Sequence, residues 1–526
     1  MLAVVAASVL LLWAGAASAL AAVYCVDFTT PPGDCTNSGY NDMQLQMALD
    51  DAGLTAANDT VRIAPGSYTN TGDFSYPDPA GGGTVSIEGS GQAQTTLTTT
   101  LQAATDQSVL TLLGAGNSVS DLTILIPAPP DVSPSDQGLV MTFATATRVS
   151  VLGPAADNAH GVEMGGGTFQ SGTVDLQVNA PSGNRAIFAS GNQTIQGTTI
   201  QSTTGFGGPG SGGTTTIDRS TIKAKATAVG TDAGTVQVSN SIIDLGNNNS
   251  AVGLSATNFN ASTAPMTINA DHVTIAGGGA NSIGARARAN NATVAQTATV
   301  TLENSIVSGP AVPLRREADN NGTANLTTSY SNYPSAGIVD TNDPDGMGMT
   351  GMGSLTQTNH TELAPGFVDP ASGNYHLASG SALIDIGDPA TPVGADAMDI
   401  DGDIRPIDGN DDGTARRDIG ADEFFVAPPP QPPQPDTDPP ETEITKAPKN
   451  RTEKTKAKYK FSSDEPGSSF ECAFDKQVKK NQFSDCDSPQ KYKRLDDGKH
   501  KFQVRAIDPA GNLDPTPDGD KFRVLD

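Results

Sequence analysis

Short stretches in which apolar and polar residues alternate recur along most of the chain. Each stretch holds two alternating segments separated by a polar turn, as in NSVSDLTILI from residue 117, VQVSNSIIDLG from 236 and VTLENSIVSG from 300. Alternation over a few residues is typical of β-strands with one buried face. The pattern therefore predicts many short strands joined by tight turns.

The alternating stretches form a drifting repeat. We align them on their second strand, which gives the anchors Leu122, Val149, Leu176, Thr199, Thr221, Ile242, Val273, Ile306 and Tyr330, spaced 21 to 33 residues apart. Such a period marks a solenoid, in which each repeat buries its apolar face against its neighbours. Leucine at fixed offsets and a tryptophan in each repeat are both missing, so leucine-rich repeats and WD propellers are excluded. We predict a parallel β-helix of roughly ten to fourteen coils, from about residue 40 to residue 425.

A helical pattern precedes the repeats. It places Tyr40, Met43, Met47 and Leu54 on one stripe and Leu45 with Leu49 on another. Unpaired ends of a β-helix would recruit other chains. We therefore expect a helix from Met43 to Leu54, covered on two sides, that caps the open end of the first coil.

The first 22 residues have the pattern of an export signal. A short apolar run ends in small residues that fit an A-x-A cleavage pattern, and we interpret residues 1–22 as a secretory signal peptide. Because basic residues are missing at its start, two alternatives stay open: the true start lies upstream, or the segment stays in the membrane as an anchor. No later stretch is long and apolar enough to span a bilayer, so we expect the mature chain to have no membrane span.

Charge and composition divide the chain in two. Residues 1–440 carry 13 Lys and Arg against 42 Asp and Glu, whereas residues 441–526 carry 18 against 16. The overall net charge of −27 disfavours nucleic acid as a partner. The proline-rich APPPQPPQPDTDPP at the boundary predicts a stiff linker over 426–440. Beyond it, alternation at period two predicts a small β-sandwich over 441–526.

The four cysteines fall in two local pairs. In an exported chain we expect two short-loop disulfides, Cys25 with Cys35 and Cys472 with Cys486. A zinc site would require closer C-x-x-C spacing and nearby histidines, so it is the weaker interpretation.

Two groups of motifs resemble known families. LAPGFVDPASGNYHLASGSALIDIGDPA from residue 363, followed by DIDGDIRPIDG and RRDIGADEF, resembles the last coils and cap of exported bacterial right-handed parallel β-helix proteins, of the polymorphic outer membrane protein and choice-of-anchor Q type. SSDEPGSSFECAFD and GKHKFQVRAIDPAGN resemble bacterial Ig-like repeats. The resemblance implies a right-handed, pectate-lyase-like β-helix over residues 23–425 with a C-terminal cap, an Ig-like β-sandwich after it, and a bacterial protein that is secreted or held at the cell surface.

An acidic loop near residue 400 offers candidate calcium ligands. They are Asp399, Asp401, Asp403, Asp408, Asn410 and Asp412. The run from Asp408 to Gly413 matches the first half of an EF-type loop, but Ile419 stands where a bidentate glutamate is required. In the family that the chain resembles, such a segment forms turns of the terminal cap, tied back by Arg405. Both interpretations stay open, and calcium is the one cofactor considered.

Two pairs of basic residues are candidates for binding a carboxylated sugar. Lys223 with Lys225, and Arg286 with Arg288, have the strand spacing that puts each pair on one face. The alternative is that both pairs are simply solvated surface positions. A glycan or another cell-envelope component is the partner that they suggest, and the oligomeric state is left open.

The coils offer little recognisable catalytic chemistry. Our alignment puts Asp218, Asn240, Ala270 and Asn304 near equivalent positions, and only one of these is acidic. We interpret His160 and the pair Asp271–His272 as turn residues. The sequence therefore favours a non-enzymatic exported protein, with the β-helix as a rigid scaffold, adhesin or glycan-contacting surface, and predicts no lyase or hydrolase activity. The alternative is a polysaccharide lyase or glycoside hydrolase, for which three carboxylates at matching coil positions would be the evidence.

Overall fold

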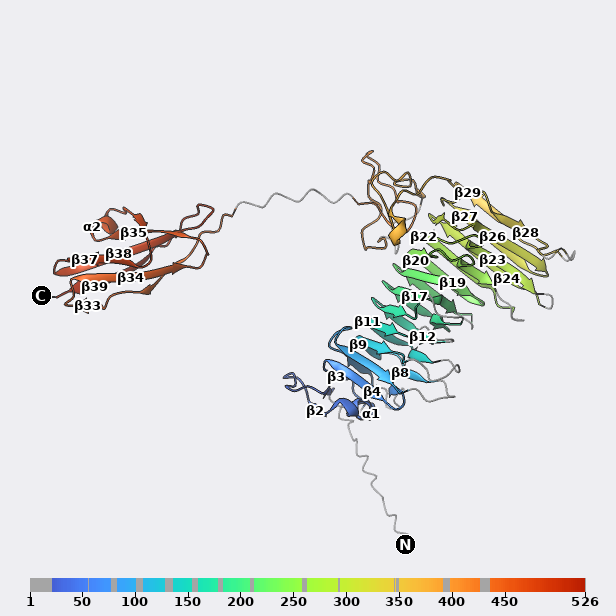
Figure 1. The fold of residues 1–526 in the computed structure, drawn as a ribbon, viewed down its shortest axis with the longest axis horizontal. Helices are drawn as coiled ribbons and strands as arrows, with labels where there is room; N and C mark the ends of the chain where they lie inside the picture. The colour runs from blue at the N-terminus through green and yellow to red at the C-terminus, as the bar shows by residue number, and fades with distance from the viewer. Residues whose placement is uncertain are drawn as a thin grey trace, which may run out of the picture. The chain divides into compact units, whose positions relative to one another are not determined.

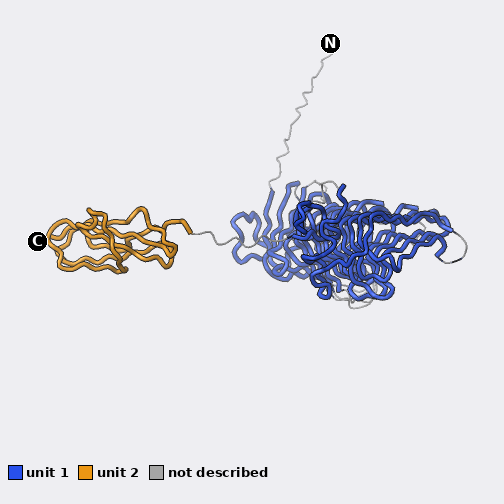
Figure 2. Tube along the Cα trace, turned by 90° about the horizontal axis from the view of Figure 1, so that it is seen from above, with its two compact units in different colours: residues 1–426 blue, residues 427–526 orange. Residues whose placement is uncertain are grey.

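The protein consists of two compact units, residues 1–426 and 427–526 (Figure 2). The structure is a computed structural model that describes residues 21–54, 56–76, 83–100, 107–127, 136–153, 159–177, 183–208, 212–257, 263–291, 294–344, 346, 350–390, 398–425 and 436–525. Nearly all of the expected signal peptide and residues 426–435 of the expected linker lie outside these residues. No described helix has the length and hydropathy of a membrane span.

The first unit is a parallel β-helix, as predicted. Its strands stack in successive layers from β3 to β29 (Figure 1), and the pairings between them are parallel. The pairings form three ladders, one for each side of the coil. Each coil contributes one strand to a ladder. The ladder on the third side has eleven described strands, and this number lies within the predicted ten to fourteen coils. The right-handed sense stays a prediction.

The ladders are named here A, B and C. Ladder A contains β2 (Asn37–Tyr40), β1 (Val23–Val26), β3 (Asp59–Ile63), β6 (Val85–Glu88), β9 (Ser118–Leu125), β11 (Ala144–Leu152), β13 (Gly167–Gln170), β16 (Gln193–Gln196), β18 (Thr214–Asp218), β20 (Gly234–Asp244), β22 (Met266–Ala276), β24 (Thr297–Glu303), β27 (Thr323–Ser329) and β29 (Leu355–Thr358). Ladder B contains the second halves of β9, β11, β20 and β22, with β4 (Gly66–Asn70), β7 (Thr95–Thr99), β14 (Thr173–Asp175), β17 (Thr199–Gly208), β19 (Thr221–Thr231) and β25 (Ile306–Ser308). Ladder C contains the second halves of β17 and β19, with β5 (Phe74–Tyr76), β8 (Ser108–Leu113), β10 (Gln137–Thr142), β12 (His160–Met164), β15 (Arg185–Ala189), β21 (Val252–Thr257), β23 (Ile283–Asn291), β26 (Val312–Asn320) and β28 (Val339–Thr341).

Inward side chains stack from coil to coil and form one continuous core. In ladder A the register aligns Ile195, Ile217, Val238, Ala270 and Leu302, all at most 2 % exposed. Burying a large aliphatic side chain stabilises a fold by about 1.5–3 kcal/mol. The repeat is therefore held by stacking, which a single coil cannot provide.

From β9 to β29, a sharp bend follows the last residue of ladder A in each coil. It is made by one residue in the left-handed region, and φ is +46° at Arg219, +45° at Asn240, +52° at His272, +45° at Asn304 and +44° at Tyr330. Asparagine tolerates this conformation better than most residues. The bend interrupts the alternation of period two, and it therefore obscures the register in the sequence.

The sequence alignment of the coils is correct in part. Leu122 pairs with Val149, and Thr199, Thr221 and Ile242 pair in series, as aligned. Three anchors are wrong, namely Leu176, Val273 and Tyr330, because Thr199 pairs with Thr173, Ile242 with Thr274, and Ile306 with Asn332. Insertions at exposed turns cost little free energy, so coil length varies and spacing alone does not fix the partner.

The N-terminal helix exists, but one predicted face of it is exposed. It consists of η1 (Asp42–Gln44) and α1 (Leu45–Gly53), and α1 contacts β1, β3 and β5. Its buried residues are Leu45, Ala48, Leu49 and Ala52. The stripe of Met43, Met47 and Leu54 is 51–83 % exposed, contrary to the prediction of cover on two sides. Because α1 packs on the first coils alone, a single apolar stripe is buried.

Residues 363–390 and 398–425 form a side subdomain, with β30 (Phe367–Asp369), η2 (Pro370–Ser372) and β31 (Asn374–Leu377). Leu377, Leu383, Ile384 and Ile419 pack on Ile306, and Tyr375 and Ala421 pack with Ile242 and Ala276. The subdomain therefore lies along the outer face of ladder B, whereas the resemblance implied a cap on the last coil. The side subdomain packs there because Ile242 and Ile306 point outward from ladder B, and burying these apolar side chains away from water is favourable.

The second unit consists of two antiparallel sheets. One contains β32 (Thr442–Lys446), β34 (Lys456–Ser463) and β37 (Gln490–Lys493), and the other contains β33 (Arg451–Thr452), β39 (Asp518–Val524), β38 (Gly498–Ile507), β35 (Ser469–Phe474) and β36 (Ser484–Cys486). β33 alone pairs in parallel, with β39. Tyr459 of the first sheet stacks on Phe502 of the second, 4.0 Å between ring centroids, in a shared apolar core. The Ig-like topology stays a prediction. Both predicted disulfides are present, Cys25–Cys35 and Cys472–Cys486.

Candidate active site

Three carboxylates occupy the same position in ladder A. Asp218 pairs with Ser239, Ser239 pairs with Asp271, and Asp271 pairs with Glu303. All four residues end the straight part of their strand and point outward. We call the three carboxylates Asp218, Asp271 and Glu303 the acidic row. The sequence analysis did not find this cluster.

The sequence missed the acidic row because its register was wrong by one residue. It aligned Asn240, Ala270 and Asn304 with Asp218, whereas the true partners are Ser239, Asp271 and Glu303. A slip of one residue exchanges the two faces of a strand. The recurring pairs Asp218–Arg219, Asp271–His272 and Glu303–Asn304, each an acid followed by a bend residue, were the signal that could have fixed the register.

The acidic row borders a groove of about 530 Å³ on the outer face of ladder A. The groove is lined by Thr194, Gln196, Thr216, Asp218, Gln237, Val238, Ser239, Asn269, Ala270, Asp271, Thr301 and Glu303. Apart from Val238 and Ala270, these residues carry hydroxyls, amides or carboxylates, and none of the lining residues that the structure describes is basic. Such a surface offers hydrogen bonds to sugar hydroxyls and carries negative charge.

Asp218 is held in place by four donors. Gln196 Nε2 and Arg219 Nε donate to Oδ2 at 3.0 and 3.1 Å, and Ser239 Oγ and Asn240 Nδ2 donate to Oδ1 at 2.9 and 3.1 Å. Burial acts to raise the pKa of Asp218, but these hydrogen bonds outweigh it and hold the pKa below its ordinary value. Asp218 is therefore a fixed anion.

Asp271 is also kept ionised. Its Oδ1 accepts a hydrogen bond from Asn304 Nδ2 at 3.2 Å and lies 2.8 Å from Nδ1 of the fully buried His272. Burial acts to raise the pKa of Asp271, but the contacts with His272 and Asn304 lower it below its ordinary value. Burial, with the nearby Arg405, lowers the pKa of His272 to about 4, so this histidine is neutral near pH 7.

Glu303 has the opposite environment. Burial raises the pKa of Glu303, and the negative charges of Asp271 and Asp388 raise it further. Asp388 belongs to the side subdomain, and its backbone N–H donates to Asn304 Oδ1 at 2.8 Å. Two neighbouring carboxylates thus have pKa values that are pushed apart, which is the usual arrangement of a general acid and its partner.

The predicted basic pairs lie on other ladders. Lys223 pairs with Asp244 in ladder B, with Nζ 3.3 Å from Oδ2, and Lys225 is exposed on the same strand. In ladder C, Arg286 donates to Ser255 Oγ at 2.9 Å. Its neighbour Arg288 lies 3.6 Å from Glu317. The four cations therefore do not form one site, and none of them lines the groove of the acidic row.

The two histidines of the coils differ from the sequence interpretation. His160 lies on strand β12 and stacks on Phe188, with 5.5 Å between ring centroids, so its assignment to a turn is wrong. His272 does stand at a bend, as expected for the pair Asp271–His272. Its contact with Asp271 nevertheless places it directly behind the acidic row.

The six candidate calcium ligands belong to several local structures. Asp399 is fully buried and accepts backbone N–H groups of Asp401, Asp403 and Glu423. In the exposed part of the loop, Asp408, Asn410 and Asp412 accept backbone N–H groups of residues 412–414. These contacts are typical of Asx turns. Arg405 is buried and pairs with Glu423 at 3.4 Å, and thus it ties the segment back, as the resemblance implied.

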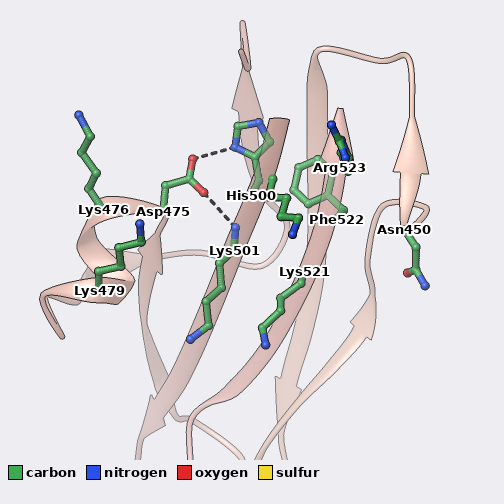
Figure 3. A pocket seen from close by; sticks show the side chains of 10 residues that line it. Asn450, Asp475, Lys476, Lys479, His500, Lys501, Lys521, Phe522 and Arg523 are labelled. Atoms are coloured by element: carbon green, nitrogen blue, oxygen red, sulfur yellow. Dashed lines mark hydrogen bonds and ion pairs between the residues drawn. The ribbon is translucent and has the colours of Figure 1, made fainter. Parts of the chain in front are cut away.

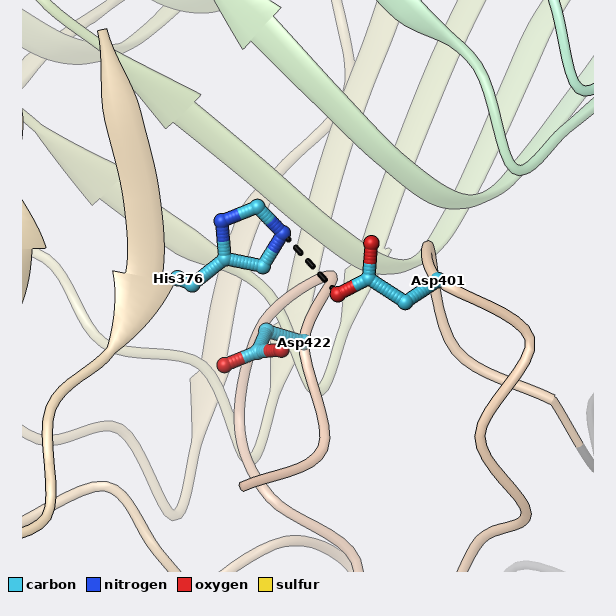
Figure 4. A group of neighbouring side chains, drawn as sticks. All are labelled: His376, Asp401 and Asp422. Atoms are coloured by element: carbon cyan, nitrogen blue, oxygen red, sulfur yellow. Dashed lines mark ion pairs between the residues drawn. The ribbon is translucent and has the colours of Figure 1, made fainter. Parts of the chain in front are cut away.

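Asp401 belongs to a different group. His376, Asp401 and Asp422 present ligand atoms within 4.8 Å of one another, and His376 Nε2 lies 3.1 Å from Asp401 Oδ2 (Figure 4). Leu377 N–H donates to Asp422 Oδ2 at 2.6 Å, and burial raises the pKa of Asp422 to about 6. A nitrogen and two carboxylates form a donor set that suits a transition metal better than calcium.

Comparisons with known proteins give weak matches. No protein-family model matches the chain, and no curated protein matches it. Among solved structures, the A-module of the mannuronan C-5 epimerase AlgE4 of Azotobacter vinelandii is 14 % identical, with a TM-score of 0.36, over 60 % of this chain and 90 % of that one. The catalytic unit of a GH87 α-1,3-glucanase from Streptomyces thermodiastaticus is 16 % identical, with a TM-score of 0.34, over 60 % and 65 %. The fold assignment therefore rests on the strand pairing of this chain.

Proposed function

We propose that the first unit is a glycoside hydrolase that cleaves a neutral polysaccharide at the acidic row. The observation that carries the proposal is the placement of Asp218, Asp271 and Glu303 at one position of ladder A, along a groove of about 530 Å³. This proposal differs from the non-enzymatic function that the sequence favoured, which is kept as the second candidate. A surface of stacked parallel strands suits a polymer, because equivalent side chains repeat along it at about 4.8 Å.

Glu303 and Asp271 have the environments of an acid and a nucleophile. Glu303, with its raised pKa, donates a proton to the glycosidic oxygen, while the ionised Asp271 attacks the anomeric carbon and the glycosidic C–O bond breaks. The deprotonated Glu303 then takes a proton from the water that attacks the anomeric carbon, and Asp271 is released as a carboxylate. The two residues stand on neighbouring coils, about 4.8 Å apart along the stack. Retaining enzymes have their two carboxyl groups about 5–5.5 Å apart, so we infer that the anomeric configuration is retained.

Asp218 has a supporting role in this proposal. It lies two coils from Asp271 and is held by four donors, so its negative charge has a fixed position at one end of the groove. A fixed carboxylate accepts hydrogen bonds from sugar hydroxyls and stabilises positive charge that develops on the ring. Asp218 therefore orients the chain and does not transfer a proton.

The lining of the groove favours a neutral substrate over a polyuronate. Among the described residues that line it, three are carboxylates and none is basic, and Arg219 beside them is already paired with Asp218, so a carboxylated sugar would be repelled. A lyase would also need a basic residue over the scissile sugar, and Lys223 and Arg286 lie on ladders B and C. These facts favour hydrolysis of a neutral glycan and disfavour elimination.

The test is a cleavage screen of the full chain on neutral and acidic polysaccharides. We expect new reducing ends from a neutral glucan, mannan or xylan, and none from pectin or alginate. Unsaturated products from an acidic polymer would show a lyase and overturn the proposal. Proton NMR of the first products would show whether the anomeric configuration is retained.

A binding function without cleavage is the second candidate. The outward hydroxyl and amide rows of ladder A continue onto coils that lack the acids, as at Thr145, Thr147, Thr168 and Gln170. Such a surface fits the scaffold or adhesin that the sequence favoured. Retention of a glycan without release of reducing ends would support this candidate over the hydrolase.

The pH profile should depend on the side subdomain. Activity requires Asp271 ionised and Glu303 protonated, so kcat/KM should rise through the lowered pKa of Asp271 and fall through the raised pKa of Glu303. Asp388→Asn removes a negative charge that raises the pKa of Glu303, so the falling limb should move to lower pH. Rate profiles of the wild type and of this variant check the shift, and an unmoved limb would contradict the assignment of Glu303.

Calcium in the acidic loop stays a proposal, and the contacts of the loop favour structural turns instead. The carboxylates of Asp399, Asp408 and Asp412 already accept backbone N–H groups. We therefore expect EDTA to leave the melting temperature of the full chain unchanged. A lower melting temperature with EDTA, restored by excess calcium, would show that the ion stabilises the folded state.

A further inference from the structure

One outer face of the second unit is crowded with positive charge. On the five-stranded sheet, Lys501 pairs directly with Lys521, Lys499 pairs with Arg523, and Arg523 pairs in turn with Arg451. Paired residues point to the same side of a sheet, and here it is the side opposite to the buried Phe502 and Phe522. We call these five cations the cationic face.

The cationic face is hollowed. A pocket of about 650 Å³ lies over β38 and β39, between the short helix α2 (Lys476–Lys479) and Asn450 (Figure 3). Lys476 and Lys479 extend from α2 on one side of it, and Lys501 and Lys521 project between. A strand spacing of about 4.8 Å and a step of about 6.8 Å along each strand arrange the charges as a grid.

None of the five cations forms an ion pair with an acid among the described residues of the unit. The ion pairs among its described residues are His500–Asp475 and Arg505–Glu471, so the cationic face has none. Asp475 lines the pocket, but its Oδ2 is 2.7 Å from His500 Nδ1 and its Oδ1 accepts the backbone N–H of Lys501, so its carboxylate is already engaged. Like charges directly opposite each other destabilise a sheet. The face therefore has a cost in stability that a bound anion would relieve.

One group of acids of the unit lies away from the pocket. Asp436, Glu465 and Asp508 place carboxylate oxygens within 4.8 Å of one another, and none of them lines the pocket. An ordinary soluble surface mixes the two signs of charge. A face whose cations have no ion pair among the described residues attracts polyanions.

We propose that the cationic face binds an acidic polysaccharide, a linear chain with carboxylates on successive sugars. Arg451 and Arg523 can bind a carboxylate through two parallel N–H groups, and the lysines add point charges along the grid. The unit would thus tether the protein to an acidic polymer. This binding is independent of the hydrolase function proposed for the first unit, whose groove repels such a chain.

The surroundings of the pocket favour a glycan over other polyanions. Phe522 and His500, which carry the rings among the described lining residues, are 3 % and 8 % exposed, so neither ring is available for stacking on bases. The large apolar side chain that is exposed among the described residues of this unit is Leu513, outside the pocket, so insertion into lipid is disfavoured. The disulfide Cys472–Cys486 fits an exported protein.

The test measures binding of the full chain to polygalacturonate by calorimetry, with dextran and duplex DNA as comparison polymers. We expect binding to polygalacturonate, none to dextran, and weaker binding to DNA at equal charge concentration. The triple substitution Lys499→Gln, Lys501→Gln, Lys521→Gln should raise Kd about tenfold or more and reduce its salt dependence. These side chains point outward, so the core is unaffected.

The other sheet of the unit supplies a matched control. Lys456, Lys458 and Lys460 are exposed on β34 and face away from the core, outside the pocket. Their triple replacement by glutamine changes the net charge by the same amount and should leave Kd within about twofold. An equal loss in both triple variants would show attraction by net charge alone. That outcome, tighter binding of DNA, or no binding of polygalacturonate would overturn the proposal.

Discussion

Replacement of Glu303 by glutamine is expected to lower kcat on the neutral polysaccharide by about 10² to 10⁴-fold, with KM little changed. Glutamine keeps the shape of the side chain but cannot donate a proton to the leaving group, and a positioned general acid contributes about that factor. Asp271→Asn should cause an equal or larger loss, because it removes the nucleophile. Reducing-end release from the substrate identified in the screen measures both.

A substrate with a good leaving group separates the two roles. An aryl glycoside whose phenolate leaves without a proton should be cleaved by Glu303→Gln at a rate much closer to that of the wild type, whereas Asp271→Asn should stay inactive. Glu362→Gln serves as the matched control, because Glu362 is exposed and lies outside the groove. Full activity of Glu303→Gln on the polysaccharide would refute the proposed mechanism.

Replacement of Arg405 by methionine should destabilise the first unit by about 3–5 kcal/mol, since removing one partner of a buried ion pair leaves its acid uncompensated. Arg405 is 0 % exposed, lies 3.4 Å from Glu423 and donates to the carbonyl oxygen of Gly420 at 3.0 Å. The buried Asp399, Asp418 and Asp422 surround it. Urea unfolding of the full chain measures the loss, and proteolysis should begin in the side subdomain.

The double variant Arg405→Met, Glu423→Gln tests the cause. If uncompensated charge is responsible, the second substitution should restore part of the lost stability, whereas a packing defect would make the effects additive. Arg62→Met is the control, because the ion pairs of Arg62 with Asp34 and Glu88 are partly exposed and should cost about 1 kcal/mol or less.

The same cluster should make stability depend on pH. Burial raises the pKa of Asp422 to about 6, and burial with the charge of Glu423 raises the pKa of Asp418 to about 8. The folded state therefore holds these protons more tightly than the unfolded chain does, so these two groups reduce the free energy of unfolding as the pH rises from about 4 to 8. Melting curves at pH 5 and pH 8 should show the higher melting temperature at pH 5.

The sequence predicted the stacking and the division of the chain, because both depend on local patterns. Alternation over a few residues marks a strand wherever it occurs, and the anchors Thr199, Thr221 and Ile242 were aligned correctly where turns are short. The change in charge near residue 440 and the proline-rich stretch before it marked the boundary between the units. The two disulfides followed from cysteines 10 and 14 residues apart.

Only the tertiary structure showed which carboxylates lie side by side. Asp218, Asp271 and Glu303 are far apart in sequence, and their alignment depends on a register that the bends at Asn240 and His272 hide. The position of the side subdomain on ladder B also had no local signature, although it brings Asp388 toward Glu303. The physical reason is common to both: local alternation fixes which faces of a strand are buried, whereas long-range pairing decides which outward side chains meet.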